Sequence, residues 1–179
     1  LRAELEATQK ALAAAEESLF IANWSAFRNA KLVGRGGFAE VFSADWREQQ
    51  VALKVPRIGL NKHEVLKIER DLRLEMKRLQ SLDHINVVRC LGLVKGGTAG
   101  IALAMSYCGG GSVHELLYSE QPPAMPERLR WIAGLAHALA YIHGQGVLHM
   151  DVKPENLLLN DTREVKLADF GLSKVTSTF

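Results

Sequence analysis

Leucine recurs at every seventh position near the start of the chain, at Leu5, Leu12 and Leu19. Leu1, Thr8 and Ala15 occupy the intervening positions, so the spacing alternates between four and three, as in the seam of a coiled coil. We therefore predict a helical leader over residues 1–22 and coiled-coil self-association through it. The alternative is the end of a helix that packs on its own domain.

The apolar pattern changes to short alternating runs between Phe27 and Tyr107. These runs are rich in Val, Leu and Ile and are separated by glycines or polar turns, which is typical of strands. Five strands are predicted, at residues 31–33, 40–44, 51–55, 87–94 and 101–105. One helix is predicted within this region, at residues 63–82, because its apolar residues recur every three or four positions.

The chain becomes helical after Ser112. A strong helix is predicted from Pro126 to about Gly144. Its expected apolar face consists of Leu129, Ile132, Ala133, Ala136, Leu139 and Ala140. Strands followed by helices indicate a two-part α+β architecture rather than alternating βαβ units.

Composition excludes several classes of protein. The 179 residues include 22 basic and 20 acidic side chains, and a net charge of +2 gives no reason to expect a nucleic acid or a membrane as partner. Cys90 and Cys108 are too few for a disulfide framework, and no apolar run is long enough to span a bilayer. A cytoplasmic location is the expectation.

A glycine-rich segment lies between the first two predicted strands of this region. Gly34, Arg35, Gly36, Gly37, Phe38 and Ala39 precede Glu40 and Val41. Such a loop lets backbone amides approach phosphate oxygens without interference from Cβ atoms. A glycine-rich hairpin turn is the alternative.

A lysine and a glutamate occur where apolar residues are expected. Lys54 shares one face of its predicted strand with Ala52, towards the glycine-rich loop. Glu75 lies on the apolar face of the predicted helix, between Leu72 and Leu79. Each charge is costly alone, so an ion pair between them is predicted; a lysine that reaches solvent from an edge strand is the alternative.

Polar residues gather in the loop that follows the second long helix. Asp151 can accept a proton, Lys153 can stabilise a phosphate, and Asn156 can bind a metal ion. Asp169, at the end of a strand-like run, can complete a magnesium site with Asn156. Polar turns are the alternative for both segments.

The segments GRGGFAEV, VALK, HMDVKPEN and DFG, in this order and with a helix glutamate between the second and third, resemble the eukaryotic protein kinase catalytic domain. Lys153, two residues after Asp151, is similar to the serine/threonine kinases. Trp46 and the zipper-like leader are similar to the tyrosine-kinase-like group, which includes the Raf and mixed-lineage kinases. The resemblance implies a two-lobed fold that binds ATP and Mg²⁺ and phosphorylates serine or threonine of a protein substrate.

On this resemblance, residues 28–108 are a complete N-lobe and hinge, with an antiparallel sheet and the family's αC helix. Residues 109–179 are a partial helical C-lobe. Lys54 and Glu75 position the nucleotide, Asp151 is the catalytic base, Lys153 stabilises the transferring phosphate, and Asn156 and Asp169 bind the metal. The nucleotide site comprises the glycine-rich loop (Gly34 to Ala39), Val41 and Ala52 above the adenine, Leu158 below it, Met105 as gatekeeper, and Tyr107 and Cys108 in the hinge.

Two departures from the family pattern shape the remaining expectations. Met150 replaces the arginine that pairs with an activation-loop phosphate, so phosphorylation of Thr176 or Thr178 is expected to change activity little. The chain begins without methionine and stops soon after the DFG motif, which is expected of a fragment. A pseudokinase or nucleotide-binding scaffold without turnover is the alternative function.

Overall fold

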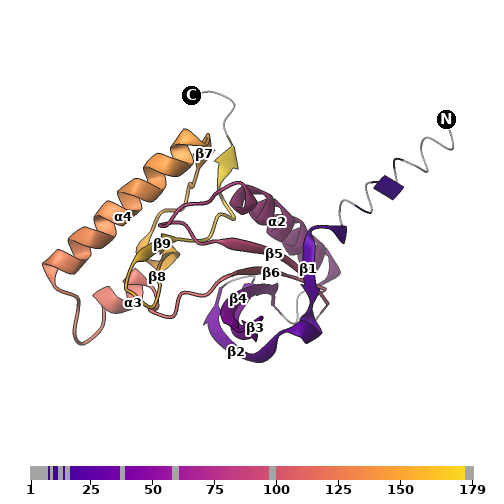
Figure 1. The fold of residues 1–179 in the computed structure, drawn as a ribbon, viewed down its shortest axis with the longest axis horizontal. Coiled ribbons are helices and arrows are strands. Elements are labelled where there is room, and N and C mark those ends of the chain that lie inside the picture. Colours follow the sequence, from indigo (N-terminus) through magenta and orange to yellow (C-terminus); the bar gives the residue numbers. More distant parts are fainter. Residues whose placement is uncertain are drawn as a thin grey trace.

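The computed structural model describes residues 8, 10, 11, 14, 17–36, 39–57, 61–96 and 100–175. The described chain is a sheet-rich part followed by a helical part (Figure 1), which confirms the predicted order of strands and helices. The sheet has the spatial order β1-β5-β6-β4-β3-β2. Its strands are β1 (Phe20–Asn23), β2 (Arg28–Arg35), β3 (Ala39–Trp46), β4 (Gln49–Pro56), β5 (Cys90–Lys95) and β6 (Ile101–Ser106).

The five strands β2 to β6 pair antiparallel and correspond to the five predicted strands. β5 begins at Cys90 rather than at Val87. Val87 instead forms a bridge to Leu167, and the Val88 N–H donates to the Leu167 carbonyl over 2.9 Å. The start of the predicted strand therefore joins the two parts of the molecule.

The end of the leader is a strand, so the prediction of a helical leader over residues 1–22 is wrong at its C-terminal end. Phe20–Asn23 forms β1, which pairs parallel with β5, so the sheet is also not wholly antiparallel. Leu19, an expected seam position, packs against the core. Without β1, the outer edge of β5 would leave its backbone groups unpaired, so this edge favours a paired strand. The aromatic and β-branched residues Phe20 and Ile21 also favour an extended chain.

The earlier leader residues that the structure describes are helical, namely Thr8, Lys10, Ala11, Ala14 and Glu17. The remaining seam positions Leu1, Leu5, Leu12 and Ala15 lie outside the described residues, so self-association through this segment stays a prediction. In the described part of the chain, no helix combines the length and the apolar character needed to cross a membrane.

The predicted helix of the sheet-rich part is α2 (Lys62–Gln80), which packs against β4, β5 and β6. Its first turn has reciprocal caps: the Asn61 side chain accepts from the Glu64 N–H over 3.0 Å, and the Glu64 carboxylate accepts from the Asn61 N–H over 2.8 Å. Its buried face consists of Ile68, Leu72, Glu75, Met76 and Leu79.

The helical part contains α3 (Val113–Leu117) and α4 (Met125–Gly144). Short elements follow α4: β7 (Val147–Leu148), a 3-10 turn at Pro154–Asn156, β8 (Leu157–Leu159), β9 (Val165–Leu167) and β10 (Lys174–Val175). β8 pairs with β9, and β10 pairs with β7, both antiparallel. These short ribbons support the loops that hold the candidate site.

The predicted boundaries of α4 are confirmed, but of its predicted apolar face only Leu139 packs against the core, and the rest of that face is wrong. Leu129 and Ile132 are 56% and 61% exposed, and the buried side consists of Trp131, Gly134, Ala138 and Ile142. Trp131 Nε1 donates to the Arg163 carbonyl over 3.0 Å. A Cβ on Gly134 would lie 2.5 Å from Val165 Cγ1, so this glycine permits the close approach of α4 to β9.

Candidate active site

One face of the sheet gathers several of the predicted nucleotide-site residues. Val41 pairs across the strands with Lys54, and Ala52 pairs with Met105. Cross-strand partners share a face, and so do residues two apart in one strand. Val41, Ala52, Lys54 and Met105 therefore lie on the same face of the sheet.

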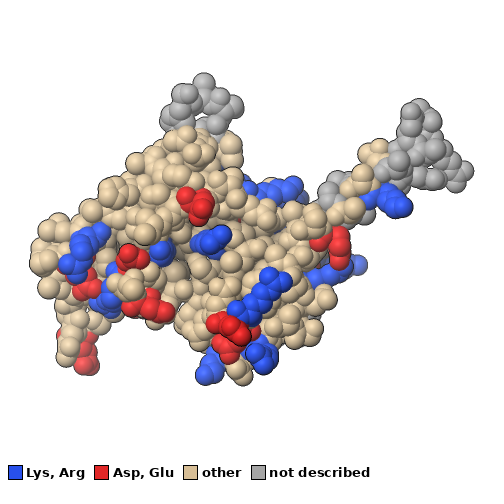
Figure 2. Space-filling view, in the orientation of Figure 1, with Lys and Arg blue, Asp and Glu red and all other residues tan. Residues whose placement is uncertain are grey.

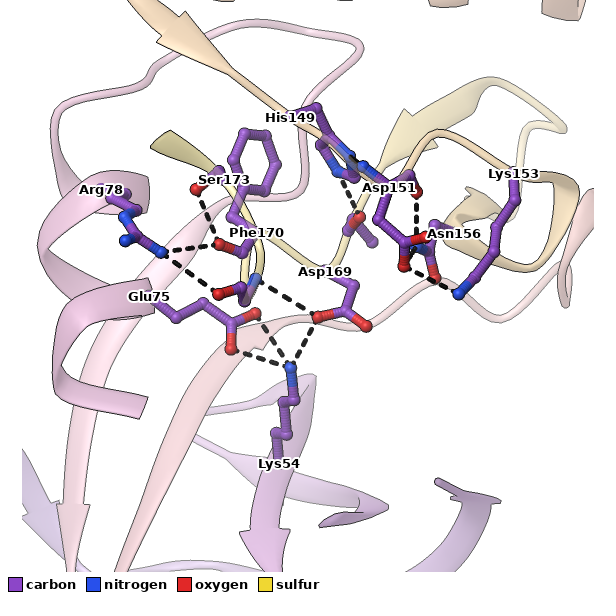
Figure 3. Close-up of polar contacts among 12 residues, drawn as sticks. Lys54, Glu75, Arg78, His149, Asp151, Lys153, Asn156, Asp169, Phe170 and Ser173 are labelled. Carbon is purple, nitrogen blue, oxygen red and sulfur yellow. Dashed lines mark hydrogen bonds and ion pairs between the residues drawn. The ribbon is translucent and has the colours of Figure 1, made fainter. Parts of the chain in front are cut away.

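Lys54 joins the sheet, α2 and the DFG segment (Figure 3). Its Nζ lies 3.1 and 2.8 Å from the two carboxylate oxygens of Glu75, and 2.9 Å from Oδ1 of Asp169. The predicted pair of Lys54 with Glu75 is confirmed. The contact with Asp169 was not predicted, because Asp169 follows Lys54 by 115 residues.

The charges in this cluster compensate each other. Burial by itself would lower the pKa of Lys54, but Glu75 and Asp169 outweigh it and raise the pKa. For Asp169, burial acts to raise the pKa, and Lys54 more than offsets it, so the pKa is lowered. Burial raises the pKa of Glu75 against the opposing effect of Lys54. The raised pKa of Lys54 and the lowered pKa of Asp169 favour the charged forms of both, and the short contacts of Lys54 with Glu75, at 3.1 and 2.8 Å, fit a charge-assisted pair.

A second cluster forms in the loop before β8 (Figure 3). Oδ2 of Asp151 accepts from Lys153 Nζ over 2.7 Å and from Asn156 Nδ2 over 2.9 Å. The hydrogen bond from Lys153, followed by that from Asn156, lowers the pKa of Asp151. The lowered pKa favours the ionised form, and the side chain is 27% exposed, so solvent reaches the carboxylate.

The two clusters are joined through His149 and Phe170. His149 Nε2 lies 2.9 Å from the Ala168 carbonyl, and the Asp151 N–H donates to Nδ1 over 3.3 Å. The rings of His149 and Phe170 meet edge to face with centroids 4.7 Å apart. Phe170 and Leu79 share one buried core. This packing links the loop that carries Asp151, the DFG segment and α2.

Arg78 is a site residue that the sequence reasoning missed. From α2, its Nη1 donates to the carbonyls of Phe170 and Gly171 over 3.2 and 3.3 Å (Figure 3). The available signal was a cation three residues after Glu75, next to the apolar face of the helix. Arg78 therefore attaches the DFG backbone to the helix that carries Glu75.

The glycine-rich segment is the hairpin between β2 and β3. Gly34 pairs with Val41, the Gly36 N–H donates to the Ala39 carbonyl over 2.8 Å, and Arg35 forms an ion pair with Glu40 at 3.2 Å. Gly37 and Phe38 lie outside the described residues. A hairpin turn can also bind phosphate through its backbone amides, so the hairpin and the phosphate-loop interpretations are compatible.

The predicted hinge residues lie beside the core rather than in the charged clusters. Tyr107 and Cys108 are half-buried after β6, and Leu158 of β8 packs against the main core. Burial raises the pKa of the Cys108 thiol to about 11, which favours the protonated thiol over the reactive thiolate at neutral pH. Tyr107 and Cys108 also line a cavity of about 510 Å³ with Asp83, His84, Ile85, Val87, Arg89, Ser106, Asn160 and Lys166.

Asn156 and Asp169 suit a divalent metal ion by the chemistry of their donor atoms. Asn156 Nδ2 donates to the backbone carbonyl and the carboxylate of Asp151, over 2.8 and 2.9 Å, which leaves the amide Oδ1 for a ligand. Asp169 engages Lys54 through Oδ1 and is 47% exposed. Carboxylate and amide oxygens are the donors that hard cations prefer.

Met150, Thr176 and Thr178 are the residues on which the expectation about phosphorylation depends. Met150 is 56% exposed, with a backbone φ of +69°, and its thioether side chain cannot pair with a phosphate as an arginine does. Thr176 and Thr178 lie outside the described residues, so the expectation about their phosphorylation stays a prediction.

Comparison with known proteins agrees with the geometry. The model of a family described as "Protein kinase domain" matches residues 27–178. The chain is 32% identical over 160 residues to serine/threonine-protein kinase pkn3 of Myxococcus xanthus, covering 85% of this chain and 28% of that protein. It is 34% identical over 150 residues to CBL-interacting serine/threonine-protein kinase 3 of Arabidopsis thaliana, covering 82% and 33%.

A third relative is the cytokinesis protein sepH of Aspergillus niger, 35% identical over 150 residues, covering 81% of this chain and 11% of that protein. The chain thus spans between about a tenth and a third of the length of these curated relatives.

Proposed function

Because this chain belongs to the protein kinase domain family, we propose that the protein transfers the γ-phosphoryl group of ATP to serine or threonine hydroxyls of protein substrates. Members of this family use ATP and a divalent metal ion. The observation that carries the proposal is the placement of Lys54 Nζ within 3.1 Å of both Glu75 and Asp169, which brings sheet, helix and DFG segment to one point.

The sheet side of the site binds and orients the nucleotide. The Lys54 ammonium, held by Glu75, faces the phosphates, and the backbone amides of the β2–β3 hairpin cover them. Val41, Ala52 and Met105 lie on the same sheet face and, with Leu158, enclose the adenine. Tyr107 and Cys108 supply the hinge backbone. Phosphoryl transfer depends mainly on such positioning, because little covalent chemistry falls to the protein.

Asn156 and Asp169 would hold Mg²⁺. Two protein oxygens leave the remaining positions to water and phosphate oxygens, which is the usual arrangement for this ion. When bound, the ion neutralises the charge that develops on the phosphates.

Asp151 and Lys153 act on the substrate side. Asp151 orients the attacking hydroxyl and accepts its proton at the carboxylate, and Lys153, 2.7 Å from that carboxylate, stabilises the transferring phosphoryl group. The lowered pKa of Asp151 keeps it ionised at neutral pH. A cytoplasmic location, where ATP and protein substrates occur, and self-association through the leader complete the proposal.

The test is the substitution Asp151→Asn in the full chain. We expect phosphorylation of a serine/threonine peptide library to fall by about 1,000-fold, the size of a general-base contribution, with binding of ATP unchanged. The matched control is Asp71→Asn, an exposed carboxylate on α2 that should leave the rate unchanged. Full turnover in Asp151→Asn would remove Asp151 from this role.

A further inference from the structure

β1 precedes the residues that the protein kinase family model matches, which begin at residue 27. It lies at the end of the sheet, next to β5, and the chain reaches it from the N-terminal segment (Figure 1). The proposed catalytic mechanism does not use it, and its residues overlap the end of the heptad leader. β1 nevertheless packs against the cores of the sheet and pairs with β5, as an ordinary strand of the sheet does.

β1 places side chains on both faces of the sheet. Leu19 and Phe20 pack against the core that contains Leu72 and Met76 of α2. Ile21, Ala22 and Trp24 pack against the second core, on the opposite face. The segment is therefore held by apolar contacts on two sides as well as by strand pairing.

Charged side chains also contact residues 17–23. Two cations contact the Phe20 ring, with Arg73 Cζ 5.5 Å and Lys95 Nζ 5.6 Å from its centroid. Lys95 also binds both carboxylate oxygens of Glu17, at 3.1 and 2.9 Å. Arg73 belongs to α2 and Lys95 to β5, so Phe20 contacts the helix and the neighbouring strand together.

β5 is shaped to receive this strand. The Leu93 N–H donates to the Leu19 carbonyl over 3.0 Å. Gly92, with φ +139°, lies so close to β1 that a Cβ on it would be 2.5 Å from Ile21 Cγ2. A side chain at position 92 would therefore displace Ile21. The glycine permits the close approach of the two backbones.

We propose that the outer edge of β5 is a strand-docking site that residues 17–23 occupy in cis, and that its occupancy holds α2 where Glu75 reaches Lys54. Arg73, which contacts the docked Phe20, precedes Glu75 by two residues on α2. Leu72 and Met76 flank this pair in the shared core. Binding or release of the N-terminal segment would thereby change the position of α2, and with it the contact of Glu75 with Lys54 in the nucleotide site.

This inference rests on the proposed function only for its activity readout. If α2 exchanges between the observed position and others, a docked strand that contacts only the observed position raises its population. The Lys54–Glu75 pair is then complete in more molecules, and the apparent affinity for ATP rises by the same factor.

The experiment compares Phe20→Ala with Asn23→Ala in the full chain. Asn23 belongs to the same strand, but its side chain is exposed and makes no cap contact. For Phe20→Ala we expect KM for ATP to rise about tenfold, a typical coupling between sites, and amide hydrogen exchange near Glu75 to accelerate. Asn23→Ala should change neither quantity.

A second pair of variants tests the docking geometry independently. Gly92→Ala should reproduce the effects of Phe20→Ala because its methyl group displaces Ile21. Gly96→Ala also places a side chain at positive φ, +93°, but its Cβ meets nothing nearer than Trp24 Cβ at 3.8 Å. Gly96→Ala should therefore leave KM for ATP and the exchange near Glu75 unchanged. A synthetic peptide of residues 17–26, added in trans, should restore the KM of Phe20→Ala, which it could not do for a misfolded protein.

Unchanged KM and unchanged exchange near Glu75 in both Phe20→Ala and Gly92→Ala would overturn the proposal, and so would a failure of the peptide to restore KM. An absence of phosphorylation by the unsubstituted chain would overturn the proposed function instead. In that case hydrogen exchange near Glu75 still decides whether the docked strand holds α2.

Discussion

His149 contacts two loops of the site through its two ring nitrogens. Nδ1 accepts from the Asp151 N–H, and Nε2 donates to the Ala168 carbonyl. Both contacts together require the neutral ring with its proton on Nε2, which we assign from this hydrogen-bond network. Burial lowers the pKa of His149 below its usual value of 6.5, with the hydrogen bond to Ala168 opposing the change.

This lowered pKa predicts a pH-dependent stability. The unfolded chain binds a proton near pH 6.5 while the folded chain does not, so the contribution is complete above pH 6.5 and is lost as the pH falls through the folded pKa. Urea unfolding at pH 7.5, 6.5 and 5.5 should show a smaller decrease for His149→Gln than for the unsubstituted protein. His143→Gln, at an exposed position on α4, is the control. Equal decreases in all three proteins would contradict the prediction.

Among the single contacts of the site, the sequence could predict some and not others. Lys54 and Glu75 could be paired in advance, because each was a costly charge on an apolar face and each explained the other. The contacts of Lys54 with Asp169 and of Arg78 with Phe170 join residues 115 and 92 positions apart. No local pattern reports a contact between residues that only the folded chain brings together.

At the scale of single elements, the start of α2 depends on local chemistry. The reciprocal hydrogen bonds of Asn61 and Glu64 satisfy two backbone N–H groups that the first turn otherwise leaves without partners. Since α2 carries Glu75 and Arg78, its stability bears on the Lys54 cluster and on the DFG segment.

Asn61→Ala should lower the free energy of unfolding by about 1 kcal/mol, the usual value of an N-terminal cap. Thermal unfolding measures the loss as a lower Tm. Asn61→Asp, which keeps an acceptor oxygen at the same place, should retain most of the stability. If Asn61→Ala melts at the same temperature as the unsubstituted protein, the cap contributes nothing.

α4 shows where an element-level prediction fails. Apolar residues surround this helix on more than one side, so its length and its boundaries followed from the sequence but its buried face did not. The face was decided by β9, whose Val165 needs the space at Gly134, and by the Trp131 hydrogen bond to Arg163. These partners lie about thirty residues later in the chain.

For the whole molecule, two cores lie on opposite faces of one sheet. The larger core reaches from α2 through Phe170 to Ile142 of α4 and therefore joins the two parts of the chain. The outer side of α4 carries exposed Met125, Leu129 and Ile132 near its N-terminal end, where Figure 2 also shows charged side chains.

Two isoleucines of α4 should therefore differ in their effect on stability. Ile142 is fully buried in the larger core, and Ile142→Ala should cost about 2–5 kcal/mol, as is usual for a large-to-small change in a core. Ile132 is 61% exposed, and Ile132→Ala should change the free energy of unfolding by no more than about 0.5 kcal/mol. Urea unfolding of both variants measures the difference, and equal losses would contradict the described packing of α4.

The sequence by itself determined the order of strands and helices, the glycine-rich hairpin, the Lys54–Glu75 pair and the polar loop around Asp151, because each depends on residues close together in the chain or on a charge that needs a partner. The tertiary structure decided the buried face of α4, the contact of Asp169 with Lys54 and the change from helix to strand at Phe20. Each of these depends on a surface that a distant segment supplies. At Phe20 that surface is the free edge of β5, whose unpaired backbone groups and neighbouring apolar side chains favour a strand where the heptad pattern alone favoured a helix.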